Sequence, residues 1–392
     1  MKNIQLLNKI AKCGTDIFDE NYAVAENIEN PDAIMVRSAV MHDMEFGDNL
    51  KAIARAGAGV NNIPLDKCAE EGIVVFNTPG ANANGVKEAA LCGMLLAVRD
   101  IVGGINWVQT VKDDPNVAKL VEKEKSKFAG TEIKGKTLGI IGLGAIGGPL
   151  ANAAVHLGMD VLGCDPYISV EAAWNLSRTI QKVNTREDIF KNADIISIHV
   201  PLIDNPDPAV STKYMINKDT IAMMKDGVII LNFARDALVN DDDIEAALKS
   251  GKVRRYVTDF PNARTAGMEG VIAIPHLGAS TEESEDNCAV MAAKQLREYL
   301  ELGNIVNSVN YPDVSMPHSG DARICVLHKN IPNIISQITT AISAEGINIE
   351  NMANRSKKDY AYTIVEITGK VPETVTEKIK AIDGIIKTNI IH

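Results

Sequence analysis

The chain has 392 residues, of which 46% are hydrophobic and 23% charged, so two or three globular domains are expected and a disordered or fibrous protein is excluded. The net charge of −11 disfavours binding to nucleic acid or anionic membranes, although a local basic pocket can still hold a small anionic substrate. No apolar run reaches the roughly 18 residues that span a bilayer, and the N-terminus has no signal-peptide core, so a cytoplasmic protein is expected. The six cysteines show no metal-ligand spacing, which predicts reduced thiols and no metal site.

Residues 1–92 are expected to form a compact α/β unit. The short apolar runs 33–36 and 73–76 are typical of buried parallel strands, and the segments 65–71 and 86–98 are expected to be helical. The second helix has little polar face, so we expect it to lie in an interface.

From residue 137 the pattern changes to a regular alternation of strands and helices. This alternation predicts a doubly wound parallel sheet, followed by an amphipathic helix at 281–301. The expected strands are 137–141, 160–164, 195–199, 228–232, 255–258 and 271–274.

The C-terminal part begins after residues 311–321, whose prolines and glycine predict a linker. The order of elements beyond it is βαββαβ, which predicts a ferredoxin-like domain at 322–392. The expected strands are 323–328, 348–354, 361–368 and 385–391, and the expected helices are 332–345 and 373–382.

A phosphate-binding turn is the most informative local motif. Gly142, Gly144 and Gly147 form a GxGxxG pattern between an expected strand and an expected helix, whose free N–H groups attract a pyrophosphate. Asp165, at the end of the next strand, would accept hydrogen bonds from the adenosine ribose and repel a 2′-phosphate. We therefore expect NAD rather than NADP. The alternative is a glycine-rich turn that only packs a helix on a sheet.

Five further segments accompany this turn in order. They are Val36-Arg37-Ser38-Ala39, Phe76-Asn77-Thr78-Pro79-Gly80, Leu231-Asn232-Phe233-Ala234-Arg235, Thr258-Asp259-Phe260 and Ile274-Pro275-His276-Leu277-Gly278-Ala279-Ser280-Thr281. In these motifs the chain resembles the D-isomer-specific 2-hydroxyacid dehydrogenases over essentially its whole length. The resemblance implies a discontinuous, flavodoxin-like substrate domain (1–98 with 281–310), a Rossmann-type NAD-binding domain (99–280), and an active site in the cleft between them.

The resemblance also implies roles for strand-end residues. Arg235 would bind the substrate carboxylate and polarise the carbonyl, and His276 would be the acid/base, with an unperturbed pKa of about 6.5. Without the motif, the two would be a surface ion-pair member and a structural histidine. Asp259 would hold the nicotinamide carboxamide. The remaining cofactor contacts would come from Ala145, Ile146, His199, Val200, Pro201, Phe233, Ala234, Gly278 and Ala279.

The substrate contacts follow from the same resemblance. Arg37 and Ser38, with Asn82, would bind a substrate phosphate, and the main-chain N–H groups of Ala58, Gly59 and Val60 would grip the carboxylate. The implied reaction is NAD-dependent oxidation of 3-phospho-D-glycerate by a homodimer or homotetramer. Arg37 could instead be part of a structural ion pair. The open alternatives for the function are a dehydrogenase for another D-2-hydroxy acid and a non-catalytic NAD-sensing protein.

One residue of the family pattern is missing. The family has a glutamate about five residues after the strand-end aspartate, where it pairs with the catalytic histidine, but Arg264 or Ala263 stands at that place here. The partner of His276 is therefore open between none, Glu269 and Asp236.

The last domain contains His328-Lys329-Asn330-Ile331-Pro332 and Gly346-Ile347-Asn348-Ile349, in which it resembles an ACT domain, a small amino-acid-binding regulatory module. By that resemblance, His328, Asn330 and Asn348 would bind L-serine at a dimer interface, making serine an inhibitor. The alternative is a ferredoxin-like oligomerisation unit without a ligand.

Overall fold

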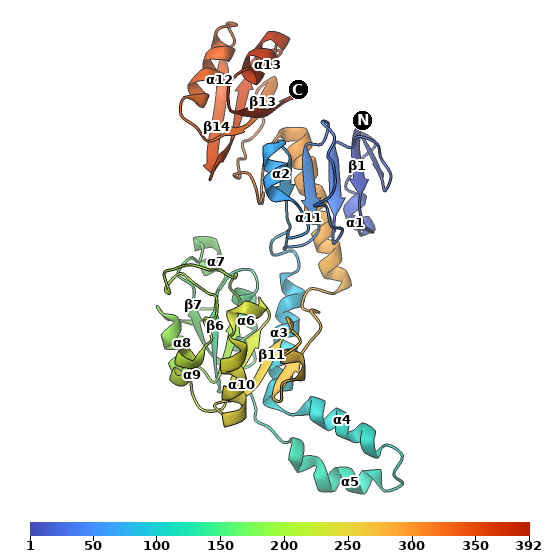
Figure 1. Ribbon diagram of the computed structural model, residues 1–392, viewed down its shortest axis with the longest axis vertical. Coiled ribbons are helices and arrows are strands. Elements are labelled where there is room, and N and C mark those ends of the chain that lie inside the picture. Colours follow the sequence, from blue (N-terminus) through green and yellow to red (C-terminus); the bar gives the residue numbers. More distant parts are fainter. The chain divides into compact units, whose positions relative to one another are not determined.

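A computed structural model describes residues 1–392 (Figure 1), and the chain folds into two compact units. The first unit consists of residues 1–82 and 282–392, and the second of residues 83–281. The first unit thus contains both chain ends, and the second is one continuous insertion.

The N-terminal part of the first unit is a five-stranded parallel sheet with the order β2-β1-β3-β4-β5. This is the flavodoxin-like order 2-1-3-4-5, as expected. The sheet is accompanied by the helices α1 (Lys12–Thr15), α2 (Leu65–Glu70) and α11 (Glu282–Leu302). Its strands are β1 (Lys2–Leu6), β2 (Tyr22–Ala25), β3 (Ala33–Val36), β4 (Ala52–Arg55) and β5 (Val74–Phe76).

The second unit contains a seven-stranded parallel sheet with the order β12-β11-β10-β9-β6-β7-β8. Counted within the unit, this is the Rossmann order 3-2-1-4-5-6 with one further strand at the β12 edge. The expected doubly wound sheet is confirmed; only the two-residue strand β8 was not expected. The strands are β6 (Thr137–Ile141), β7 (Asp160–Cys164), β8 (Gln181–Lys182), β9 (Ile195–Ile198), β10 (Val228–Asn232), β11 (Val253–Thr258) and β12 (Val271–Ala273).

Helices complete the layers of the second unit. They are α3 (Ala83–Val98), α4 (Ile101–Val111), α5 (Val117–Glu124), α6 (Gly147–His156), α7 (Val170–Trp174), α8 (Arg186–Asn192), α9 (Lys218–Met223) and α10 (Asp241–Ser250), with short 3-10 turns η1 (Lys125–Phe128), η2 (Asp236–Leu238) and η3 (Thr265–Gly267). Helix α3 packs on β10, β11 and α6, and a Cβ at Gly93 would lie 2.9 Å from the ring of Phe233. This close packing places α3 with the second unit, so the expected boundary at 98/99 is corrected to 82/83.

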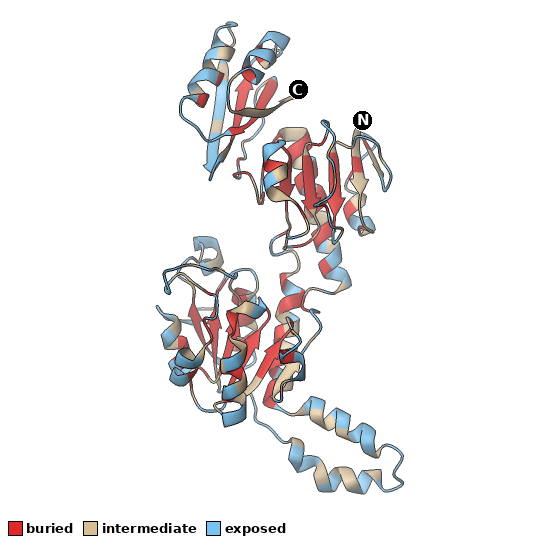
Figure 2. Cartoon of the chain, in the orientation of Figure 1, coloured by how far each residue is buried: buried red, intermediate tan, exposed pale blue.

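Helices α4 and α5 form an arm that projects from the second unit (Figure 1). None of the residues of α4, α5 or η1 is buried (Figure 2). The apolar side chains of Ile101, Val102, Ile105 and Val108 are exposed along α4.

The C-terminal domain has the expected βαββαβ order and an antiparallel sheet, β14-β15-β13-β16. Its helices α12 (Ile334–Ser343) and α13 (Glu373–Lys380) bury one face of this sheet, around Ile324 and Val326. On the other face, Cys325 and Tyr362 belong to the same core as the N-terminal sheet and α11. The strands are β13 (Ala322–Lys329), β14 (Ile349–Lys357), β15 (Tyr360–Ile367) and β16 (Ile385–Ile391).

The start of the segment 311–321 is packed, contrary to the expectation of a flexible linker, whereas most residues from 315 onward are exposed. Tyr311 and Val314 are buried in the shared core, and the Tyr311 hydroxyl donates to the carbonyl oxygen of Ala69 at 2.6 Å. Proline and glycine indicated irregular backbone correctly, but the apolar side chains between them anchor that backbone to the first unit.

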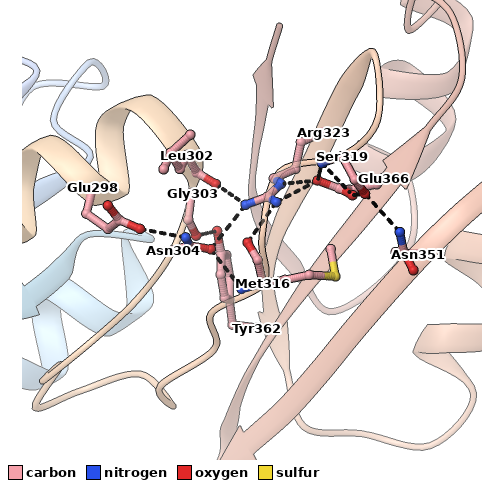
Figure 3. A network of polar contacts seen from close by, with 10 residues as sticks. All are labelled: Glu298, Leu302, Gly303, Asn304, Met316, Ser319, Arg323, Asn351, Tyr362 and Glu366. Carbon is pink, nitrogen blue, oxygen red and sulfur yellow. Dashed lines mark hydrogen bonds and ion pairs between the residues drawn. The ribbon is translucent and has the colours of Figure 1, made fainter.

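A buried ion pair joins the C-terminal domain to the end of α11 (Figure 3). Arg323 and Glu366 are both 0% exposed, with Nη2 of Arg323 2.6 Å from Oε1 of Glu366. The other guanidinium N–H groups donate to the carbonyl oxygens of Leu302 and Met316 and to Oδ1 of Asn304. Every N–H donor of this guanidinium thus has a hydrogen-bond partner. Through these partners Arg323 connects the strands β13 and β15, the end of α11 and the segment between α11 and β13.

Candidate active site

The glycine turn between β6 and α6 has the geometry of a phosphate cradle. Gly142 has a φ of 92°, and a Cβ there would lie 2.5 Å from the carbonyl oxygen of His199. A Cβ at Gly147 would clash with the carbonyl oxygen of Gly142, so the helix can begin this close to the strand only with glycine. Gly144 has no atom within 4 Å of its Cβ position, which leaves that side of the turn, next to Ala145 and Ile146, open to a ligand.

Asp165, which directly follows β7, stabilises this turn by hydrogen bonding. Its Oδ2 accepts from the N–H of Leu143 at 2.8 Å, and its Oδ1 accepts from the N–H of Tyr167 at 2.9 Å. A carboxylate oxygen has a second lone pair, so both oxygens keep the capacity to accept a ribose hydroxyl.

The other expected cofactor residues lie at the carboxyl ends of neighbouring parallel strands. His199, Val200 and Pro201 follow β9, Phe233 and Ala234 follow β10, and Gly278 and Ala279 follow β12 by a few residues. The carboxyl ends of parallel strands meet at one edge of the sheet, where a doubly wound fold binds its ligands. The structure therefore brings these residues to one edge.

His199 is a neutral group at this edge. Its Nε2 lies 2.8 Å from the Ser197 hydroxyl, while its buried Nδ1 has no hydrogen-bond partner. Burial lowers the pKa of His199 to about 4, which keeps the imidazole uncharged near neutral pH.

Asp259 offers an unused acceptor beside the loop after β12. It is 2% exposed; its Oδ2 accepts from the N–H of Gly278 at 3.3 Å, while its buried Oδ1 has no partner. Burial raises the pKa of Asp259, and the charges of His276 and Arg235 act in the opposite direction. A buried acceptor without a partner is costly unless a ligand donates to it, and a nicotinamide carboxamide can do so. The residues present thus fit the cofactor.

Arg235 and His276 are both exposed and both adjoin the ring of Phe260. The Arg235 Cζ lies 5.5 Å from the centroid of that ring, and the His276 ring centroid lies 4.4 Å from it at an interplanar angle of 46°. His276 has a φ of 44°, a conformation uncommon for a residue with a side chain and often found at functional sites.

No carboxylate takes the place of the missing glutamate. Arg264 is held by Asp242 and by Glu245, whose Oε2 is 2.6 Å from its Nη2. Glu269 is exposed, Oδ1 of Asp236 accepts from the N–H of Ala237, and His276 takes part in no ion pair.

A second group of expected residues lies at the strand ends of the first unit. Arg37 follows β3, and its Nη2 forms an ion pair of 2.5 Å with Oε1 of Glu285. The N–H groups of Arg37 and Ser38 both donate to Oδ1 of Asn8 at 3.0 Å. Asn82 is the last residue of this part of the unit.

The loop after β4 presents unused main-chain donors. No hydrogen bond within the chain uses the N–H groups of Ala58, Gly59 or Val60, as an anion-binding loop requires. The carbonyl oxygen of Ala58 accepts from the Asn77 side chain at 2.7 Å, which fixes the start of the loop.

Arg55 is a candidate that the sequence analysis missed. It is the last residue of β4, and its Nε donates to the Arg37 carbonyl oxygen at 3.1 Å, so two guanidinium groups belong to one site. Burial and the charge of Arg37 lower the pKa of Arg55. A cation at the carboxyl end of a parallel strand is a signal that would have identified it.

The proposed effector residues do not meet within one chain. His328 is 3% exposed, and its ring nitrogens lie 2.8 Å from the carbonyl oxygen of Lys329 and the hydroxyl of Thr363. Asn330 follows β13 at the end where Lys329 pairs with Tyr360, whereas Asn348 precedes β14 at the end where Ile349 pairs with Ile367. At about 3.4 Å per residue these two sheet ends are about 24 Å apart.

Two further findings concern the whole chain. No group of three or more His, Cys, Asp or Glu side chains is placed to hold a metal ion, and the six cysteines are unpaired. No helix has both the length and the apolar character needed to cross a membrane.

The fold and the site define an NAD-binding oxidoreductase, and the comparisons with known proteins agree. Residues 91–278 match the family "D-isomer specific 2-hydroxyacid dehydrogenase, NAD binding domain". D-3-phosphoglycerate dehydrogenase of Haemophilus influenzae is 30% identical over 364 residues, 89% of this chain and 83% of that protein. The chain belongs to the D-isomer-specific 2-hydroxyacid dehydrogenase family.

Other relatives differ in length or in name. D-3-phosphoglycerate dehydrogenase of Methanocaldococcus jannaschii is 34% identical over 323 residues, 80% of this chain but only 58% of that protein. Hydroxypyruvate reductase of Thermotoga maritima is 37% identical over 288 residues, 70% of this chain and 86% of that protein. The NAD+-bound 3-phosphoglycerate dehydrogenase structure of Entamoeba histolytica matches with a TM-score of 0.60 and 26% identity, covering 79% of this chain and 98% of that one.

Proposed function

We propose that this protein oxidises 3-phospho-D-glycerate to 3-phosphohydroxypyruvate with NAD, the first step of L-serine biosynthesis. The observation that carries the proposal is the pair of cations, Arg37 and Arg55, at the strand ends of the first unit. Like charges held close together repel one another, and a bound phosphate relieves that repulsion. A non-phosphorylated 2-hydroxy acid needs only one cation for its carboxylate.

In this proposal each residue of the site has a separate role in the reaction. Arg235 binds the substrate carboxylate through its planar guanidinium and polarises the developing carbonyl. His276 accepts the proton of the 2-hydroxyl group as that group becomes a carbonyl. Bound NAD supplies the hydride acceptor. The free Oδ1 of Asp259 accepts from the carboxamide and orients the nicotinamide ring.

The exclusion of NADP belongs to the same proposal. Asp165 keeps a negative charge where a 2′-phosphate would lie, and no arginine follows it in Pro166-Tyr167. The glycine turn from Gly142 to Gly147 receives the pyrophosphate at the start of α6.

A second function has its own support. The Thermotoga maritima relative is named a hydroxypyruvate reductase, and Arg37 already has a carboxylate partner in Glu285. If Arg37 stays in its ion pair with Glu285 when the substrate binds, the site has one fewer cation for a phosphate, and a smaller 2-oxo acid is preferred.

Steady-state kinetics with 3-phosphoglycerate, glycerate, lactate and hydroxypyruvate separate these functions. We expect Arg55→Met to raise KM for 3-phosphoglycerate by about tenfold to a hundredfold, the loss of one charge-assisted hydrogen bond, and to change kinetics with glycerate little. Arg297→Met is the matched control, because Arg297 forms an exposed ion pair with Glu301 in the same unit. Equal effects on both substrates would contradict the phosphate role. Absence of turnover with all four, together with NAD binding, would support the NAD-sensing alternative.

We propose in addition that the C-terminal domain is an ACT-type regulatory domain with L-serine as its effector. Its support is the βαββαβ order of elements. Because Asn330 and Asn348 lie at opposite ends of the sheet, two copies of the chain are needed to complete one serine site in this proposal. The exposed apolar side chains of α4 also favour a homodimer or homotetramer. Six unpaired cysteines are consistent with an enzyme of the reducing cytoplasm.

A further inference from the structure

The feature that the proposed function leaves unexplained is how the catalytic histidine is held. No side chain forms a hydrogen bond or an ion pair with the His276 imidazole, although its main-chain N–H donates to the carbonyl oxygen of Ile274 at 2.9 Å. A general base without an orienting partner samples several rotamers, and its reacting nitrogen spends little time in line with the substrate.

Phe260 supplies the contact that is otherwise lacking. Its ring centroid is 4.4 Å from that of His276, within the range of favourable aromatic pairs. The same ring lies 5.5 Å from the Cζ of Arg235, within cation–π distance. One aromatic side chain thus touches both groups that the proposed reaction requires.

The position of Phe260 is fixed by its own strand. It directly follows Asp259 after β11, its N–H donates to Oγ1 of Thr258 at 3.0 Å, and its side chain is half-buried. Thr258 is fully buried, so the backbone that carries the ring is anchored in the sheet.

The charges acting at this point are few. The charges of His276 and Arg235 both act on the Asp259 carboxylate, whose pKa they lower against the effect of burial. The Asp242 and Glu245 carboxylates are engaged by Arg264, Asp236 accepts a main-chain N–H, and Glu269 is exposed.

We propose that Phe260 is a positioning residue that orients His276 and Arg235 through its ring and stabilises the imidazolium formed during turnover. The proposal rests on the proposed roles of these two residues. In the oxidation direction the O–H bond of the substrate breaks, its proton passes to the imidazole, and the hydride passes from C2 to the cofactor. The imidazole becomes a cation next to the electron-rich ring, so the ring lowers the energy of the charged product of proton transfer.

The test replaces the ring and keeps the apolar volume. We expect Phe260→Leu to lower kcat with 3-phosphoglycerate by about tenfold and to raise its KM by about threefold, because the two groups lose their common support. Phe260→Tyr, which keeps the aromatic ring, should restore kcat to within about twofold. Thermal unfolding of each variant checks that the fold is intact.

A spectroscopic measurement separates positioning from a purely structural effect. The NMR chemical shifts of the His276 ring protons in the full chain should change in the Leu variant and stay close to the wild-type values in the Tyr variant, since only the Leu variant lacks the neighbouring aromatic ring. If the Leu variant keeps the wild-type kcat and His276 chemical shifts, the inference is wrong, while loss of activity in His276→Asn and Arg235→Met would still support the proposed function. If His276→Asn stays active, the proposed function itself fails.

Discussion

At the scale of single residues, Asp165 performs two tasks at once. Its carboxylate accepts from the N–H groups of Leu143 and Tyr167, which shapes the glycine turn, and its charge faces the proposed position of the adenosine ribose. A substitution at this position therefore changes both the loop and the cofactor preference.

We expect Asp165→Asn to shift the ratio of kcat/KM for NADP over NAD upward by about tenfold. The amide removes the negative charge but keeps one acceptor oxygen for the loop, and a tenfold change corresponds to about 1.4 kcal/mol. Kinetics with both cofactors measure the ratio. Asp188→Asn, at the capping box of α8, is a control that removes a charge elsewhere in the unit. An unchanged ratio would mean that another residue excludes the 2′-phosphate.

At the scale of elements, the joint between α11 and the strands β13 and β15 depends on one buried charge pair. Against the cost of burial, the hydroxyl of Ser319, the guanidinium of Arg323 and the main-chain N–H of Ser319 lower the pKa of Glu366 to about 2. Asn351 on β14 donates to the same hydroxyl at 3.0 Å, so three of the four strands of the C-terminal sheet contribute to the network.

We expect Arg323→Met to reduce the free energy of unfolding by about 3–5 kcal/mol, because it leaves the Glu366 carboxylate buried and unpaired. The double variant Arg323→Met with Glu366→Leu should regain most of this loss, because it removes both charges. Chemical denaturation measures all three proteins. A double variant as unstable as the single one would show that Arg323 acts through its carbonyl contacts to Leu302 and Met316.

The same pair predicts a pH dependence of stability. The folded-state pKa of Glu366, about 2, lies below the ordinary value of 4.5, so the paired carboxylate stabilises the fold above that ordinary value. This contribution is lost as the pH falls from about 4.5 toward 2. We expect the wild type to lose unfolding free energy relative to the double variant over this interval in denaturation series, because the double variant has no carboxylate at position 366 to protonate.

At the scale of the whole molecule, the C-terminal domain shares a core with the N-terminal sheet. Cys325, Leu327 and Tyr362 pack in one cluster with Tyr299 and Tyr311. Deletion of the domain would expose these side chains, so point variants test the proposed serine regulation better than a truncated chain.

We expect Asn330→Ala and Asn348→Ala each to abolish inhibition by L-serine and to leave kcat without serine unchanged, because each removes one half of a site shared between two chains. Lys370→Ala, an exposed change in the same domain, should keep inhibition. Co-refolding the two asparagine variants should restore part of it, since one of the two sites in a mixed dimer is then intact. Persistent inhibition in both single variants would place the effector site elsewhere.

The local sequence was sufficient to predict the elements that have a clear hydrophobic pattern and characteristic residues at their ends. The strand Ile385–Ile391 and the strand Ala33–Val36 agree with the expectation, and the glycine turn required by Gly142 and Gly147 lies where GxGxxG placed it. These signals are local because a buried strand needs an apolar run and a tight turn needs glycine.

Only the tertiary structure decided the remainder. The strands Lys2–Leu6 and Ala52–Arg55 have mixed or alanine-rich sequences and become strands because neighbours pair with them on both sides. The contact of Phe260 with Arg235 and His276 joins three separate strand ends, and the packing of Tyr311 joins a proline-rich segment to a distant core. The hydrophobic pattern of a single segment does not predict such contacts, because they depend on which faces of the helices and sheets pack together after the sheets have formed.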